Sequence, residues 1–324
     1  MLTALTRFHF FCAGCAPVVG LALAAPAAAQ SVPDRSIELG FELGLQADSN
    51  VARANASRAA LRGIDRADLR VSPALTAAID YPIGPHLIEA DAYLGYDFYM
   101  RNSRLNAERL RLDGRAKLDF QFCEVTPRIG FSRQRTEFES SGFLDPDAPL
   151  LVDNIETQQT YGADISCGRQ VGLRPLAGIE YARGDNSSDL RRRSDYDATT
   201  IRVGVGYRQP AIGDIQLYAS RRQTNFPERT VGGIPDRFVL RSAGVSYQRD
   251  IGTRFTFDGD VSYADLSSRF GGNGFGGINY SVGLSAIVSE RLQLRGTFAR
   301  AIQTSLSNDA NYTVTENYGL NATY

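Results

Sequence analysis

The chain has 324 residues, 43% of them hydrophobic, which is too apolar for a disordered protein and long enough for one large domain or two ordinary ones. The 35 basic residues nearly balance the 36 acidic ones, so a nucleic-acid-binding protein is not expected. Only two residues are histidine, which disfavours metal binding and general-base catalysis. We therefore expect no enzymatic activity, no metal site and no cofactor.

The first predicted element is an export signal over residues 1–29. It has one basic residue, an apolar run over residues 8–25 and the small residues Ala27–Ala29 at its end, as secretory signal peptides do. A transmembrane anchor is the main alternative, but the run is short and is broken by proline and glycine. A lipoprotein signal ending at Cys15 is a second alternative, disfavoured because the apolar run continues past that residue. The mature domain is then residues 30–324.

From residue 36 to the C-terminus, apolar and polar side chains alternate. In residues 36–48 the odd positions from Ile37 to Leu45 are apolar, and the even positions are polar or glycine. A period of two places these sets on opposite faces of a strand. The pattern predicts about fourteen strands, with twelve to sixteen allowed, over residues 36–48, 67–81, 87–100, 108–122, 125–138, 155–167, 173–184, 196–208, 214–224, 237–249, 254–266, 277–288, 291–304 and 312–324.

Short and long connections alternate between these strands, which is typical of transmembrane antiparallel up-and-down β-barrels with short periplasmic turns and longer extracellular loops. Residues 51–66 have no regular apolar face and are interpreted as a loop, and residues 225–236 as another long loop. Residues 139–154 contain an apolar run that is expected to fold inward and narrow a pore. A soluble β-sandwich is the main alternative, but its strands are usually shorter, about 5–6 residues.

The last strand carries a candidate assembly signal. Its apolar residues alternate up to an aromatic C-terminus, which resembles the sorting signal of bacterial outer-membrane barrels. The residues concerned are Tyr318, Leu320, Ala322 and Tyr324.

In a closed barrel the polar face of each strand becomes the wall of a lumen, where charge is expected. The candidate lumen or constriction residues are Arg109, Arg111, Arg115, Lys117, Arg128, Arg174, Arg202, Asp91, Asp97 and Glu89. If Met100 pairs with Glu108, then Asp97 faces Arg111. Two interpretations stay open: an ion-pair network that stiffens the wall, and a charged constriction that selects permeating solutes.

Two cysteines remain after cleavage of the signal, Cys123 and Cys167, and an exported protein favours a disulfide between them. They are expected at the ends of the fourth and sixth strands. One strand would then separate their Cα atoms by about 9–10 Å, so the turns would have to lean together. Two unpaired thiols are the alternative.

The segment Asp48-Ser49-Asn50-Val51, directly after the first strand, resembles the Asp-x-Asn-Val segment of the β-barrel porin type 2 family, and Pro73 in the second strand fits the same family. The resemblance implies an outer-membrane barrel with no established substrate. Some relatives are associated with exopolysaccharide export. It supplies no functional residue that can be matched here.

Two functions follow. The first is a passive diffusion channel for small hydrophilic solutes in the bacterial outer membrane. The alternative is an accessory barrel with a plugged lumen in exopolysaccharide export or envelope assembly. Expected partners are outer-membrane lipid and lipopolysaccharide, whose phosphates the run Arg191–Arg193 could contact, together with the barrel-assembly machinery and, for the alternative, polysaccharide-export components.

Overall fold

The computed structural model describes residues 5–6, 35–135, 154–169, 171–270, 274–289, 291–304 and 312–324. Most of the predicted export signal and nearly all of the segment 139–154 lie outside these residues, so both stay predictions. None of the described helices is long and apolar enough to cross a membrane.

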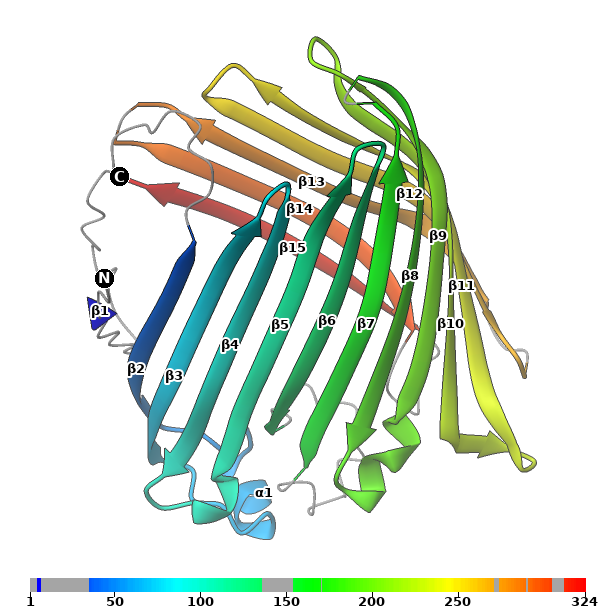
Figure 1. The fold of residues 1–324 in the computed structure, drawn as a ribbon. Coiled ribbons are helices and arrows are strands. Elements are labelled where there is room, and N and C mark those ends of the chain that lie inside the picture. Colours follow the sequence, from blue (N-terminus) through cyan, green and yellow to red (C-terminus); the bar gives the residue numbers. More distant parts are fainter. Residues whose placement is uncertain are drawn as a thin grey trace. The chain divides into compact units, whose positions relative to one another are not determined.

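The described residues form one sheet, and its hydrogen-bonded strand order is the order along the chain (Figure 1). After a two-residue strand, β1 (Leu5–Thr6), come fourteen long strands: β2 (Ser36–Asp48), β3 (Asp68–Ile83), β4 (His86–Tyr99), β5 (Ala107–Phe120), β6 (Cys123–Arg135), β7 (Ile155–Cys167), β8 (Gly172–Asn186), β9 (Tyr196–Gln209), β10 (Gly213–Val231), β11 (Ile234–Ile251), β12 (Phe255–Ser268), β13 (Phe275–Ile287), β14 (Gln293–Thr304) and β15 (Tyr312–Thr323). This confirms the predicted all-β, antiparallel up-and-down fold of fourteen strands. The connections contain the short helices α1 (Ala56–Leu61), η1 (Ser103–Leu105) and η2 (Asp189–Ser194).

The chain divides into two compact units. The first comprises Met1–Lys117, Arg128–Gln159 and Asp185–Arg191, and the second comprises Leu118–Pro127, Thr160–Gly184 and Arg192–Tyr324. Each contains a small buried hydrophobic cluster among its described residues. The cluster of the first unit consists of Val51, Ala52, Ala59, Ile64, Tyr99 and Leu105. The cluster of the second consists of Phe226, Phe238 and Leu266.

Each strand has an apolar face and a polar face. The apolar face holds the odd-numbered positions of β2, β3 and β6–β12 and the even-numbered positions of β4, β5 and β13–β15, and cross-strand partners keep this parity. Its large side chains are exposed, for example Ile37 at 64%, Val203 at 52% and Leu320 at 84%. A soluble sheet would bury such a face, so these side chains need an apolar environment outside the chain.

The connection between β10 and β11 corrects the predicted long loop over residues 225–236. Both strands extend into this segment and meet at a two-residue turn, Gly232-Gly233, with a register irregularity between Phe226 and Thr230. Both glycines have positive φ, 60° and 80°, as two-residue hairpin turns with the twist of the strands require. Phe226 and Phe238 pack edge to face beside the hairpin, with ring centroids 5.8 Å apart. The Gly-Gly pair was the signal for this hairpin.

The segment 51–66, interpreted as a loop, contains the helix α1. Asn55 caps it, because its side-chain oxygen accepts a hydrogen bond from the backbone N–H of Arg58 (2.9 Å). Only one residue of the helix, Ala59, is buried, which explains why no apolar stripe of helical period marks it in the sequence.

The Asp48–Val51 segment organises this connection. The Asp48 carboxylate accepts a hydrogen bond from the Asn50 backbone N–H (2.8 Å), and the Val51 N–H donates to the Arg66 carbonyl (2.7 Å). Asp48 also forms an ion pair with Arg53 (3.3 Å), and the Val51 side chain lies in the buried cluster. Residues 48–51, on which the family resemblance is based, therefore stabilise the connection between β2 and β3.

Asp68, the first residue of β3, contacts the connection between β4 and β5. Its carboxylate accepts hydrogen bonds from the backbone N–H groups of Arg101 (3.0 Å) and Asn102 (2.9 Å) and from the Asn102 side-chain amide (2.7 Å). Burial alone would raise the pKa of the Asp68 carboxyl. The hydrogen bonds outweigh burial, and the pKa lies below its ordinary value.

Candidate functional site

On the polar face of the first unit, Asp97 of β4 is the centre of an ion-pair network, called here the Asp97 network. Its carboxylate contacts the guanidinium groups of Arg109 on β5 (3.1 Å) and Arg70 on β3 (3.5 Å), and accepts a hydrogen bond from the Ser72 hydroxyl (2.6 Å). Arg70 also donates to the Gln46 side chain on β2. Asp97 is only 6% exposed, so its charge depends on these partners.

The register of β4 with β5 differs from the predicted one. Asp97 pairs with Ala107 instead of Arg111. In the connection, the Tyr99 N–H donates to the Asn106 side chain (2.7 Å), and the Asp68 carboxylate accepts from the backbone N–H groups of Arg101 and Asn102. The displacement is an even number of residues, so every candidate keeps its predicted face.

The observed register produces a bidentate ion pair between β4 and β5. Glu89 lies opposite Arg115, whose Nε and Nη2 donate to its two carboxylate oxygens at 2.6 and 2.7 Å. Arg111 instead pairs along its own strand with Asp113 (2.5 Å), which lies opposite Asp91. The remaining candidates of this region are also on the polar face: Lys117, opposite Leu87, and Arg128 on β6.

In the second unit, Asp214 of β10 joins two arginines on the polar face. Arg174 of β8 (2.6 Å) and Arg208 of β9 (2.6 Å) both donate to its Oδ2 atom. Strand β9 lies between β8 and β10, and Arg174 lies directly opposite Gly206 of β9. From this position Arg174 reaches across β9 to Asp214.

Arg202 of β9 lies over the ring of Tyr218 on β10, with 3.8 Å from its guanidinium carbon to the ring centroid. The Tyr218 hydroxyl donates to the Asp260 carboxylate on β12 (2.8 Å). Tyr218 lies opposite Gly244 of β11, so it too reaches across a strand at a glycine. The polar face thus carries charged and aromatic side chains linked over three strands at a time.

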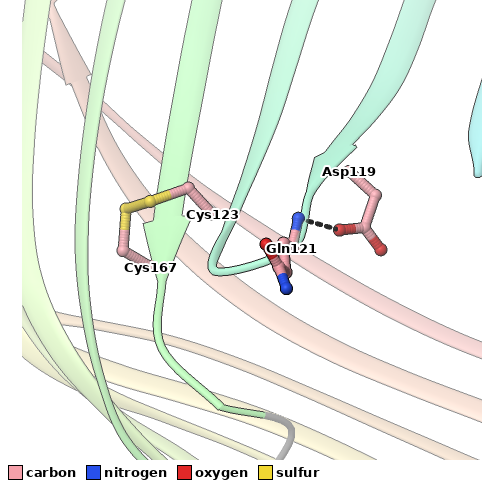
Figure 2. Close-up of a disulfide and its surroundings, with 4 residues drawn as sticks. All are labelled: Asp119, Gln121, Cys123 and Cys167. Atoms are coloured by element: carbon pink, nitrogen blue, oxygen red, sulfur yellow. Dashed lines mark hydrogen bonds between the residues drawn. A yellow bond between two sulfur atoms is a disulfide. The ribbon is translucent and has the colours of Figure 1, made fainter.

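Figure 2 shows the disulfide between Cys123 and Cys167. Their Cα atoms are 4.0 Å apart, not the expected 9–10 Å. Strand β5 ends at Phe120, and Gln121 turns the chain with a φ of 60°, so Cys123 begins β6 and does not end the preceding strand. Strands β6 and β7 are neighbours, so no strand lies between the two cysteines.

The structure places the candidates on the polar face in several separate groups, and whether any of them forms a constriction stays a prediction. Sequence reasoning missed Arg70, Asp214 and Tyr218 as partners. Parity would have placed all three on the polar face, but their partners depend on register and on side-chain reach. The described residues hold no group of three or more His, Cys, Asp or Glu side chains arranged to bind a metal ion.

The candidate assembly signal lies on the apolar face of β15. Tyr318, Leu320 and Ala322 lie opposite Phe298, Gly296 and Leu294 of β14. Tyr318 and Leu320 are exposed at 63% and 84%. The signal itself stays a prediction.

No protein-family model matches the chain, and no curated protein matches its sequence. Solved structures match at low similarity. The ferric preacinetobactin receptor BauA from Acinetobacter baumannii has a TM-score of 0.40 and 8% identity, over 77% of this chain and 49% of the receptor, so the chain spans about half of its length. A bacterial polysaccharide outer membrane secretin has a TM-score of 0.41 and 9% identity, over 87% of this chain and 94% of the secretin. The outer membrane channel DcaP of Acinetobacter baumannii has a TM-score of 0.36 and 12% identity, over 92% of this chain and 99% of the channel.

Proposed function

We propose that the chain is an outer-membrane β-barrel that acts as a passive diffusion channel for small hydrophilic solutes. The observation that carries this proposal is the division of one antiparallel sheet into an exposed apolar face and a charged polar face. Lipid would cover the apolar face, and the polar face would line the lumen.

The lengths of the strands fit this role. The long strands have 12–19 residues, more than the 9–11 that a tilted strand needs to cross the hydrocarbon layer. Aromatic residues of the apolar face gather near the short turns, where Tyr207, Tyr247 and Phe257 lie close to the strand ends. Aromatic side chains at this level are typical of a membrane interface.

The polar face fits a water-filled lumen. Some of its ion pairs are open to solvent, for example Arg115–Glu89, with 63% and 23% of the two side chains exposed. Such exposed pairs contribute little to stability, and their charges fit a role in attracting or orienting charged solutes.

Single-channel recording in planar bilayers tests the channel. The folded protein is expected to give steady ohmic steps. Absence of steps from protein that is folded and inserted would overturn the channel and favour the accessory barrel with a plugged lumen. Heat-dependent migration in detergent gels and protease protection in vesicles establish insertion independently. A protein that stays soluble without lipid would overturn the barrel itself.

A further inference from the structure

The apolar face of the second unit contains a hollow with a charged end. Its volume is about 450 Å³, within the range of small-molecule sites. The residues that carry the argument are Val203, Ala219, Ala243, Tyr263, Arg221 and Arg241.

The hollow arises from two small side chains in neighbouring strands. Ala219 of β10 lies directly opposite Ala243 of β11, while the larger Val203 and Tyr263 flank them on β9 and β12. Both alanines are exposed, so the depression opens outward. Its floor and walls are apolar, as an acyl chain requires.

Two residues further toward the Gly232-Gly233 turn, the same strands carry charge. Arg221 lies directly opposite Arg241, and Arg241 lies opposite Asp265 of β12. Opposed positions place the Cβ atoms about 5 Å apart, where like charges destabilise a sheet. Asp265 is 3.9 Å from Arg241, whereas Arg221 donates a hydrogen bond to the Gln223 side chain (3.2 Å). The row of Arg221, Arg241 and Asp265 therefore carries two positive charges and one negative charge on the apolar face.

We propose that this hollow binds a phosphorylated, acylated glycolipid of the outer leaflet, of the lipid A type. One acyl chain lies over Ala219 and Ala243, and a phosphate group takes hydrogen bonds from Arg221 and Arg241. The inference rests on the proposed outer-membrane location, because the charged row lies toward the end of the strands at which β8–β9 and β12–β13 have their longer connections, the expected extracellular side. A phosphate monoester suits the site because it can accept from both guanidinium groups.

A second hollow on the apolar face of the first unit provides a contrast. It has a volume of about 270 Å³ and is lined by Phe41, Leu75, Leu94 and Tyr96, but its charged residue is Glu108. That carboxylate is paired with Arg133 at 2.7 Å. An acidic residue with a single arginine leaves no excess positive charge for a phosphate.

Native mass spectrometry of the delipidated, refolded protein tests the assignment, with diphosphorylated lipid A, enzymatically dephosphorylated lipid A and phosphatidylglycerol as probes. The unmodified chain is expected to retain lipid A at least tenfold better than either of the others. R221Q/R241Q should lose at least tenfold in lipid A affinity, and A219L/A243L, which fills the hollow without touching the charges, should also lose affinity. R300Q is the matched control, because Arg300 is also on the apolar face and is paired with a single acid, Glu316 (3.7 Å).

Equal retention of phosphatidylglycerol, or unchanged lipid A binding in both double variants, would overturn the site. If R221Q/R241Q does not fold, A219L/A243L tests the apolar contacts of the hollow, and dephosphorylated lipid A tests the phosphate contacts with the unmodified chain. Failure of the unmodified chain to enter any lipid bilayer would instead overturn the proposed location, so the two failures are distinguishable.

Discussion

Replacing Asp97 with alanine tests the interpretation of the polar face most directly. The substitution removes a carboxylate that is 6% exposed and leaves Arg70, Arg109 and the Ser72 hydroxyl without it. Breaking a buried ion pair costs about 3–5 kcal/mol. The two arginine side chains are 29% and 33% exposed and can recover some hydration. We therefore expect a loss of about 2–3 kcal/mol in unfolding free energy.

Urea unfolding in detergent micelles or thin bilayers measures this loss, with Asp113→Ala as the matched control. Asp113 is also on the polar face, but its side chain is 46% exposed and its described ion pair is with Arg111 on its own strand. Its loss is expected to cost less than about 1 kcal/mol. Equal losses in the two variants would refute the argument from burial. Asp97→Asn removes the negative charge alone. Under a salt gradient, its reversal potential should shift in the direction that indicates greater anion selectivity of the channel.

Three further predictions concern the disulfide, a glycine and pH. Replacing Cys123 and Cys167 with serine should cost up to about 4 kcal/mol on chain-entropy grounds for a separation of 44 residues, measured by urea unfolding, and alkylation followed by mass spectrometry should show no free thiols in the mature chain, residues 30–324, without these substitutions. Gly244→Ala should destabilise by about 1–3 kcal/mol because an added Cβ would lie 2.5 Å from the Cβ of Ser262, whereas Gly296→Ala, with its nearest contact at 3.6 Å, should be tolerated. The pKa of Asp68 is lowered in the folded state, so the ionised carboxylate stabilises the fold above its ordinary pKa of 3.8, and this stabilisation is lost as the pH falls through the folded-state pKa. Amide hydrogen exchange at residues 101–102 should therefore accelerate over that pH range. The Asp68→Asn variant should show no such acceleration.

The fold was predictable from residues such as Ile37 and Leu45, because a period of two fixes the face of each side chain regardless of its partners. Register was not predictable in the same way. The pairing of Asp97 with Ala107 depends on Asn106 and Asp68, which bind the connection through contacts far apart in the sequence. The position of Cys123 was misplaced by a few residues because nothing in its strand's alternation marks a turn at Gln121.

The partners of Asp214 were hidden for a related reason. Arg174 reaches it across an intervening strand, so the contact depends on the registers of three neighbouring strands together. The alternation in the sequence could place each residue on the polar face, but it could not predict which charged side chains would form ion pairs.

The disulfide has a topological consequence. It joins the first residue of β6 to the last residue of β7, so residues 123–167 become a covalently closed ring that contains the whole connection between these strands. A protease that cuts this connection would leave a nicked molecule whose two pieces separate only after reduction. The connection can thus be cleaved by design while the disulfide keeps the two pieces covalently joined.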